Sequence, residues 1–306
     1  MVENNSSGVV LKYYTLLKSS GIVSDDDSIL IDPFEEDFKD KEYIVLQQGQ
    51  AEWNLSNKKI KHIITPNVSI FEKLSKKFEI YLIEFPIDTS IYSKTTDWNK
   101  REDAIYYHGR IIPQKLPIDE LKHISDQGIK IVLQGPICKA YWIDEELNDS
   151  YYVDYKNKLM KLDIEILDQA KDEKELAENL NKYKFYFTLS NGEAFNVALQ
   201  EAISCGTIPL VKQSGAYWWS DKRHFPVQSV DDFIKKYKSI KDLDLENYSK
   251  HIAEDALENF SFDASYEKFK AGFWHKLWKN SPEIDFEIKS LVKNYSQHVE
   301  TVMSCS

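Results

Sequence analysis

Two glutamates, Glu193 and Glu201, stand eight positions apart in a segment whose pattern predicts a strand, a turn and a helix. Aromatic and β-branched residues begin at Phe185, a turn sequence follows at 190–192, and the helix is expected over about 194–204. At about 1.5 Å rise per residue, the two carboxylates would lie roughly 12 Å apart along the helix axis. The unpaired N–H groups and positive dipole end of the helix lie between them and suit a diphosphate. The spacing therefore suits one nucleotide-sugar, bound at its sugar, its diphosphate and its ribose.

The alternative for this pair is a chance spacing on a solvated helix. The chain has 50 acidic residues, so two glutamates at this interval occur on many helices, and Glu201 alone is an ordinary helix residue. The choice between the two interpretations depends on residues elsewhere in the chain.

A loop with two cations follows an earlier predicted strand at 104–107. It runs from His108 to Lys115 and reads HGRIIPQK. Ligands of open α/β sheets bind beyond the carboxyl ends of the strands, which is where Arg110 and Lys115 are expected. Two fixed cations there would neutralise a diphosphate and stabilise charge on a leaving group without a metal ion. The alternative is an exposed arginine and lysine in an ordinary loop.

Predicted strands and helices alternate along the chain and would position these groups. In the first part, the predicted elements are a helix at 9–17, strands at 28–31, 43–46 and 62–64, a helix at 68–77 and a strand at 80–85. A polar segment without periodicity, 93–101, is interpreted as a linker. Alternation of this kind favours a parallel sheet with helices around it.

A second alternating series follows this segment. Its predicted strands are at 104–107, 129–134 and 163–167, then the strand from Phe185 and one at 207–211. Its predicted helices are at 117–124, 152–160, 173–181 and 194–204, followed by 231–239, 245–259, 265–276 and 282–302. We therefore expect an α/β protein with Rossmann-like domains at 1–98 and 99–280. A helical tail at 281–306 completes the chain, and packing back on the first domain is one option for it.

Composition excludes several functional classes. With 306 residues and 42% hydrophobic residues, the chain can bury the cores of two domains. Its apolar runs fall well short of the ~20 residues that a membrane span requires, and no signal-peptide pattern follows Met1, so a cytoplasmic location is expected. The net charge of −11 opposes broad attraction to nucleic acid or anionic lipid. The three cysteines lack ligand spacing, so neither a disulfide framework nor a zinc site is expected.

The combination of Gly109-Arg110, Lys115 and the two later glutamates resembles glycosyltransferase family 4. This group contains the retaining enzymes of the two-domain GT-B fold. Further segments fall in the order of that family's landmarks between Ser6 and Phe273; they are 63–67, 86–92, 133–135, 166–176 and 259–262. The resemblance implies two Rossmann-like domains that face a cleft, and transfer of a sugar from a nucleotide donor.

The resemblance also implies roles for individual residues. Arg110 and Lys115 would hold the donor diphosphate. Glu193 would contact the sugar, and Glu201 would bind the ribose. The rest of the donor site would come from residues near the phosphates, the sugar and the base: Gly8, Gln169, Ala170, Ala194, Phe195, Asn196 and Val197. A nucleotide-sugar such as a UDP- or GDP-sugar would be the co-substrate, with no cofactor and no metal expected.

Several candidates keep two interpretations each. Gly8 either brings its backbone close to the phosphates or belongs to an ordinary helix cap. Gln48 and Gly49, after a predicted strand, are either part of an acceptor wall or a polar turn. His108 either reaches the acceptor side of the site or is a structural histidine with its bonds satisfied.

The sequence departs from the family pattern in two places. Only seven residues precede Gly8, and Val2 is the one apolar residue after Met1, so the first domain is either abbreviated or lacks its first strand. Ala194 and Asn196 stand where the family often has glycines, which narrows the space near the sugar. Predictions about the acceptor, which the first domain normally binds in this family, are accordingly the least defined.

These observations predict a metal-independent retaining glycosyltransferase. It would move a hexose or related sugar from a nucleotide-sugar to a hydroxyl acceptor on a glycan, glycolipid or similar molecule. One alternative is a phage-type DNA glycosyltransferase that acts on hydroxymethylated bases, which the compact first domain favours and the acidic charge opposes. Another is an inactive GT-B module that binds a nucleotide-sugar or a partner protein, which the short first domain favours.

Overall fold

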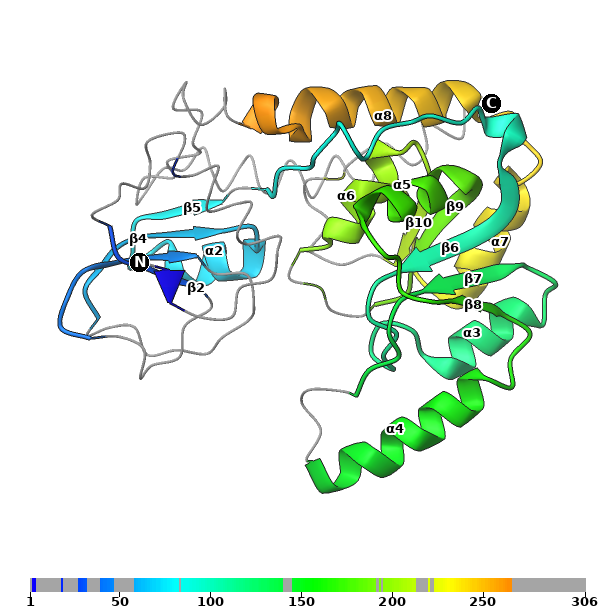
Figure 1. The fold of residues 1–306 in the computed structure, drawn as a ribbon, viewed down its shortest axis with the longest axis horizontal. Helices are drawn as coiled ribbons and strands as arrows, with labels where there is room; N and C mark the ends of the chain where they lie inside the picture. The colour runs from blue at the N-terminus through cyan, green and yellow to red at the C-terminus, as the bar shows by residue number, and fades with distance from the viewer. Residues whose placement is uncertain are drawn as a thin grey trace. The chain divides into compact units, whose positions relative to one another are not determined.

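The chain forms two compact units, each built on a parallel sheet of its own (Figure 1). The computed structural model describes residues 2–3, 18, 27–31, 39–46, 58–82, 84–139, 145–190, 193, 195–212, 220 and 223–265. Of these, the first unit contains the residues up to Pro86 together with Ser220 and 259–265. The second unit contains 87–212 and 223–258.

The first unit has a five-stranded sheet in the order β1-β2-β3-β4-β5, and every strand pair is parallel. The strands are β1 (Val2–Glu3), β2 (Ile29–Ile31), β3 (Tyr43–Leu46), β4 (Ile60–Thr65) and β5 (Ile80–Leu82). The helix α2 (Val68–Leu74) begins after Asn67, whose side chain accepts the N–H of Ser69 at 2.9 Å. Ile70 and Phe71 of this helix pack into the core of the unit.

The first domain begins with the short strand β1. This strand has two residues and pairs Val2 with Ile29 and Glu3 with Leu30. A first strand is therefore present, and its length explains why periodicity alone did not reveal it. The predicted helix at 9–17 and the candidates Gly8, Gln48 and Gly49 lie outside the described residues.

The second unit has a six-stranded sheet in the order β11-β10-β9-β6-β7-β8, again with every pair parallel. The strands are β6 (Glu102–His108), β7 (Ile131–Gln134), β8 (Glu165–Leu167), β9 (Tyr183–Thr188), β10 (Ile208–Lys212) and β11 (Phe225–Val227). Counted within this unit alone, the order is that of the dinucleotide-binding Rossmann fold. The order reverses between β6 and β9, and ligands of such sheets bind beyond the carboxyl ends of the strands at this switch point.

Helices cover both sides of this sheet. The helices of the second unit are α3 (Ile118–Ser125), α4 (Glu145–Leu159), α5 (Glu173–Lys182), α6 (Val197–Ser204), α7 (Val230–Ile240) and α8 (Glu246–Phe260), of which α8 has its last two residues in the first unit. In Figure 1, α5 and α6 lie on one side of the sheet and α3 and α7 on the other. Asp172 and Ser229 cap α5 and α7 by accepting backbone N–H groups of the first turn. Within the described residues, no helix has the length and apolar character needed to cross a membrane.

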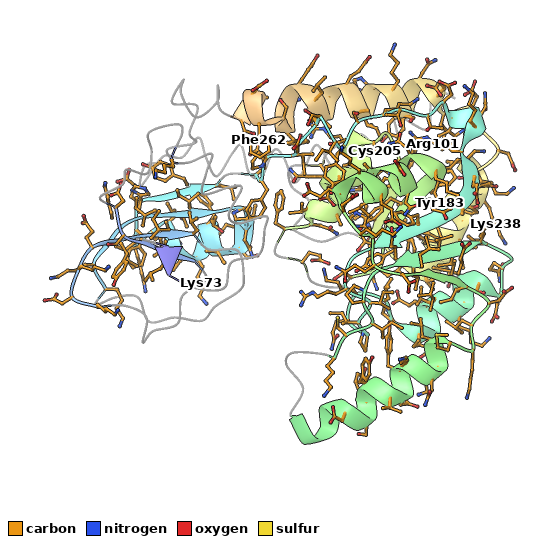
Figure 2. The ribbon with its side chains drawn as sticks, viewed as in Figure 1. Lys73, Arg101, Tyr183, Cys205, Lys238 and Phe262 are labelled. Atoms are coloured by element: carbon orange, nitrogen blue, oxygen red, sulfur yellow. The ribbon has the colours of Figure 1, made fainter. Side chains whose placement is uncertain are left out.

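The core of the second unit is rich in aromatic side chains. Tyr183, Phe185, Tyr186 and Phe187 of β9 are all fully buried. Their continuous burial is typical of a central parallel strand that is covered on both faces. Figure 2 shows Tyr183 and Cys205 in the interior of this unit and Lys238 projecting from α7.

Most predicted elements of this unit are confirmed, with three differences. The helix predicted at 152–160 begins earlier, at Glu145. The helix predicted at 194–204 begins later, at Val197. The strand β11 has three residues with a proline in the middle, which is too short and too atypical for its pattern to indicate a strand.

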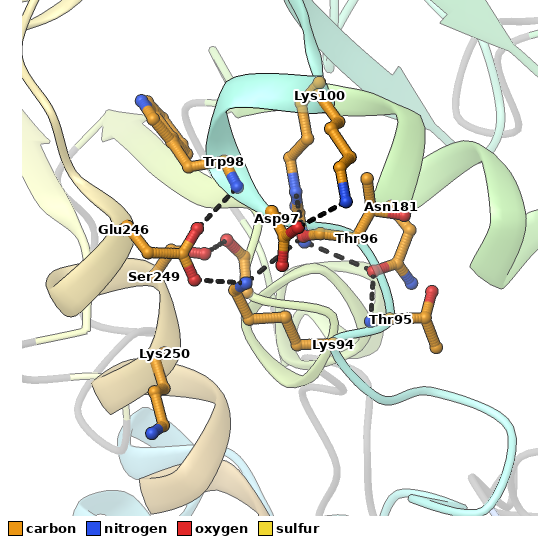
Figure 3. A network of polar contacts seen from close by, with 12 residues as sticks. Lys94, Thr95, Thr96, Asp97, Trp98, Lys100, Asn181, Glu246, Ser249 and Lys250 are labelled. Carbon is orange, nitrogen blue, oxygen red and sulfur yellow. Dashed lines mark hydrogen bonds and ion pairs between the residues drawn. The ribbon is translucent and has the colours of Figure 1, made fainter.

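The interpretation of residues 93–101 as a linker is wrong. They belong to the second unit and are held by a polar network (Figure 3). Lys94 pairs with Glu246 at 2.7 Å, and the backbone N–H of Trp98 donates to the other oxygen of Glu246 at 2.5 Å. The side-chain oxygen of Asn181 accepts the N–H of Thr95 at 2.8 Å. The segment lacks periodicity because its order comes from polar bonds to distant residues, not from an apolar face.

Candidate functional site

The switch point of the second sheet is bordered by the loops that follow β6 and β9. β6 ends at His108, and the loop after it carries Arg110 and Lys115. β9 ends at Thr188, and the segment after it carries Glu193 before α6 begins. The topology thus brings the two predicted groups to the same edge of the sheet, although they are about 80 residues apart in sequence.

Two glycines allow the loops after β6 and β7 to approach each other closely. Gly109 has φ 128° and Gly135 has φ 136°, values that favour glycine because no Cβ is present. A Cβ on Gly135 would lie 2.1 Å from the carbonyl oxygen of Gly109. The N–H of Gly109 also donates to the carbonyl of Gln134 at 3.0 Å. Both positions therefore require glycine for the backbone to take this path.

A pocket of about 400 Å³ opens beside these glycines. It lies entirely within the second unit, and its walls come from the ends of β6 and β7 and from the segment that leads into α5. The lining residues are His108, Gly109, Arg110, Gln134, Gly135, Pro136, Gln169, Ala170, Asp172, Glu173 and Leu176. Four residues predicted from the sequence thus meet at one cavity: His108, Arg110, Gln169 and Ala170.

Lys115 and Glu193 form an ion pair that joins the loop after β6 to the loop after β9. The Lys115 Nζ lies 3.0 Å from one carboxylate oxygen of Glu193 and 3.2 Å from the other. The Glu193 side chain is only 9% exposed, so solvent screens this pair less than it would a surface pair. A cation predicted for the diphosphate and a carboxylate predicted for the adjoining sugar are therefore direct neighbours.

His108 connects the pocket to Glu201. Its Nε2 lies 3.3 Å from the carbonyl oxygen of Ala198 and 3.4 Å from a carboxylate oxygen of Glu201. Burial is the main cause that lowers the pKa of His108 to about 4, and the charge of Lys115 lowers it further. The imidazole is therefore neutral at pH 7, and since both neighbours of Nε2 are acceptors, Nε2 carries the proton. The contact with Glu201 is then a hydrogen-bonding one and not an ion pair.

Tyr92 is a neighbour of Glu201 that sequence reasoning did not assign. Its side chain is buried, and burial raises its pKa above the usual range, with a further increase from the negative charge of Glu201. The phenol therefore stays protonated at neutral pH. The segment 86–92 matched a family landmark, but a single tyrosine in it gave no sign of a partner more than 100 positions away.

The region before α6 differs from the expected helix. The cap is Asn196, whose side-chain oxygen accepts the N–H of Leu199 at 3.1 Å, and the helix begins at Val197. Glu193 therefore precedes the helix in extended or irregular backbone, and the helical rise does not apply between Glu193 and Glu201. The assumption of a continuous helix, on which the estimate of their separation rested, is wrong for this reason. Ala194 lies outside the described residues, and Phe195 is partly buried beside the cap.

Glu201 lies in the middle of α6 with a side chain that is 13% exposed. It is therefore not the fully solvated helix residue of the alternative interpretation. Among the described residues, no group of three or more His, Cys, Asp or Glu side chains is arranged to hold a metal ion.

Comparison with known proteins gives similarity in structure only. No protein-family model matches the sequence, and no curated protein sequence matches it significantly. HepE from Anabaena, solved with UDP and glucose, has a TM-score of 0.62 at 11% identity over 76% of this chain and 71% of its own. A glycosyltransferase from Rickettsia africae has a TM-score of 0.59 at 14% identity over 92% and 85%. Sucrose-phosphate synthase from Thermosynechococcus elongatus has 0.57 at 13% identity over 76% and 67%.

These solved structures are GT-B glycosyltransferases, and the chain shares their fold. Identities this low establish the fold alone. The predicted GT-B fold of two parallel-sheet units with helices is confirmed.

Proposed function

We propose that this protein is a retaining glycosyltransferase that moves a hexose or related sugar from a nucleotide-sugar to a hydroxyl acceptor on a glycan, glycolipid or similar molecule. One observation carries the proposal. Arg110 and His108 line a pocket at the switch point of a Rossmann-ordered sheet, and His108 and the β6 loop link that pocket to Glu201 and to the Lys115–Glu193 pair. The two cations suit the diphosphate of a nucleotide-sugar, and the two carboxylates suit its hydroxyl groups.

The diphosphate is the part of the donor that needs cations. Arg110 is exposed and lines the pocket, and Lys115 lies on the same loop. We assign both to the diphosphate, with Lys115 shared between a phosphate oxygen and Glu193. Two cations offset the charge of the leaving diphosphate as it develops, so the proposed reaction needs no metal ion.

The two carboxylates are assigned to hydroxyl groups. Glu193, held by Lys115, accepts hydrogen bonds from the transferred sugar, and Glu201, next to the neutral His108, accepts them from the ribose. The wall with Gln169 and Ala170 is assigned to the base. These roles follow the family resemblance, and the shared edge of the sheet supports them.

Retention requires that the new bond forms on the face from which the diphosphate leaves. In the proposed step, the bond between the sugar C1 and the diphosphate oxygen breaks while a bond between C1 and the acceptor oxygen forms. The proton of the acceptor hydroxyl passes to the departing phosphate oxygen, which keeps atoms and charge balanced. Arg110 and Lys115 stabilise the negative charge on that oxygen until it receives the proton.

A donor panel tests the proposal. Since HepE was solved with UDP-glucose and a pneumococcal O-GlcNAc transferase with UDP and GlcNAc, UDP-glucose and UDP-GlcNAc are the first donors to try, with GDP-mannose as the second base. Titration calorimetry measures binding, release of UDP or GDP measures turnover with and without EDTA, and NMR of the product gives its anomeric configuration. Inversion of configuration or loss of turnover in EDTA would contradict the corresponding part of the proposal.

Glu193→Ala provides the decisive variant. Loss of a carboxylate that binds the reacting sugar is expected to lower kcat/KM by about 100-fold or more, ~3 kcal/mol of transition-state stabilisation. Glu178→Ala, an exposed glutamate on α5 away from the pocket lining, is the matched control and should keep the parental rate. A Glu193→Ala variant that transfers or hydrolyses donor as fast as the parent would contradict the assignment of Glu193 to the reacting sugar.

A further inference from the structure

Gln134, at the carboxyl end of β7, is a buried amide in the wall of the pocket. Its side chain is 3% exposed. Its Oε1 accepts a hydrogen bond from the hydroxyl of Tyr106 and another from the Nδ2 of Asn179 at 3.1 Å. Its Nε2 donates to the backbone carbonyl of Asp168 at 3.1 Å. Three hydrogen bonds thus hold one side chain from three directions.

The orientation of this amide is determined by the chemistry of its neighbours. The carbonyl of Asp168 can only accept, so the NH₂ group of Gln134 has to face it. The amide NH₂ of Asn179 donates, so the oxygen of Gln134 has to face Asn179. Burial raises the pKa of Tyr106 above its usual range, so its hydroxyl keeps its proton and is able to donate to the same oxygen. Every contact agrees with a single orientation.

These bonds connect Gln134 to the opposite wall of the pocket. Asp168 comes directly before Gln169 and Ala170, which line the pocket, so a fixed Asp168 carbonyl fixes the start of that wall. Asn179 lies on α5 three residues after Leu176, which also lines the pocket. The cations Arg110 and Lys115 lie instead on the loop after β6, whereas the side-chain hydrogen bonds of Gln134 go to Tyr106, Asp168 and Asn179.

We propose that Gln134 is a positioning residue for the nucleoside half of the donor, and that it acts by holding the Asp168–Ala170 wall in place. The inference rests on the proposed function and names the part of the ligand that this network serves. The base is a flat group that needs a rigid wall at a fixed distance, whereas the diphosphate is bound by cations on another loop. Loosening the wall therefore weakens nucleoside recognition and leaves the diphosphate contacts in place.

Gln134→Met tests this, because methionine keeps the length of the side chain and removes its hydrogen bonds. Titration calorimetry with UDP, GDP and ADP identifies the nucleoside diphosphate that the parent binds best. The Kd for that nucleotide should rise about tenfold in the variant, equal to ~1.4 kcal/mol. The affinity for inorganic pyrophosphate, measured by competition, should stay within about twofold, because its contacts lie on the other loop. In turnover assays, KM for the donor should rise while kcat stays nearly constant.

Asn179→Leu is the second variant, for the case in which Gln134→Met does not fold. Asn179 does not line the pocket and donates to Gln134, so a loss of nucleotide affinity that the Asn181→Leu control on the same helix does not share is assigned to Gln134. We expect the Kd to rise about threefold, in the same direction as for Gln134→Met. Asn181→Leu is the matched control on the same helix, since Asn181 is a buried amide that bonds to Ser93 and Thr95 instead. It should lower the melting temperature and leave the nucleotide Kd unchanged.

The outcomes separate this inference from the proposed function. A parent that binds none of the three nucleotides would overturn both. A parent that binds one of them, with unchanged Kd in Gln134→Met and Asn179→Leu, would overturn the positioning role alone. An equal loss for the nucleotide and for pyrophosphate would also overturn it, because the effect would then be a general disturbance of the site.

Discussion

The strand β6 has an arginine just beyond each end, and the two arginines have opposite environments. Arg101, before the strand, is 4% exposed and donates to five acceptors, among them the carbonyl of Cys205 at 2.7 Å and the hydroxyl of Thr207 at 3.2 Å. Arg110, after the strand, is exposed and lines the pocket. Figure 2 shows Arg101 near Cys205, inside the unit.

The difference shows how one residue type is buried and fully bonded at one edge of a sheet and exposed at a pocket at the other. Burial lowers the pKa of Arg101 to about 10, so it is still charged at neutral pH, and its donors are bound within the protein. A guanidinium whose hydrogen-bond donors are all bound within the protein cannot bind a ligand. Ligands of open α/β sheets bind at the carboxyl edge, where the exposed guanidinium of Arg110 lines the pocket.

Removal of the buried arginine is expected to have the largest effect on stability. Arg101→Leu leaves several buried acceptors without a donor and should lower the free energy of unfolding by about 4 kcal/mol. Urea denaturation measures this loss. At a temperature where the variant is folded, its nucleotide Kd should equal that of the parent. A stable variant with weakened nucleotide binding would show that Arg101, and not only Arg110, serves binding.

Gly135→Ala tests the close approach of the two loops at the carboxyl edge. The positive φ and the 2.1 Å contact with the Gly109 carbonyl require the backbone to shift, at a cost of about 3 kcal/mol. The shift moves Arg110 as well, so both the urea midpoint and nucleotide affinity should fall. Gly128→Ala is the control, because Gly128 also has a positive φ but has open space around it, and its loss should be about 1 kcal/mol.

Arg110→Ala should show the opposite profile from Arg101→Leu. We expect a change in unfolding free energy within about 0.5 kcal/mol, since exposed side chains contribute little to stability. Donor affinity and turnover should fall about 30-fold, ~2 kcal/mol, through loss of a charge-assisted bond to the diphosphate. The result is checked by calorimetry with UDP and with pyrophosphate, and both should weaken together. Unchanged affinity for UDP and for pyrophosphate would show that Arg110 does not bind the donor.

The last prediction concerns the pH dependence of stability. The pKa of His108 is about 4 in the folded chain against 6.5 for an unperturbed histidine, so the unfolded chain binds the proton more readily. The contribution of His108 is therefore fully present above about pH 6.5 and is lost as the pH falls toward 4. Urea midpoints between pH 7 and 4.5 should fall more steeply for the parent than for His108→Gln. Parallel curves would show that His108 is not buried in its neutral form.

Local pattern was sufficient to predict most of the strands and helices of the second unit. Strands such as β7 and β9 are composed mostly of apolar or aromatic residues, and α5 and α7 combine a capping residue with an amphipathic repeat. β1 was missed because two residues carry no measurable period, and β11 was missed because a proline stands in the middle of its three residues. The polar segment around Arg101 was misread because its partners lie up to about 150 positions away.

For the candidate site, the residue types were predictable and their neighbours were not. The sequence alone determined that Arg110, Lys115, Glu193 and Glu201 belong to loops and a helix that follow parallel strands, because that depends on short-range periodicity. Only the tertiary structure decided that Lys115 pairs with Glu193, that His108 meets Glu201, and that Gln134 holds the wall of the pocket. These contacts depend on which strands are adjacent in the sheet. Strand order is a property of the packed chain, and no local pattern of residues encodes it.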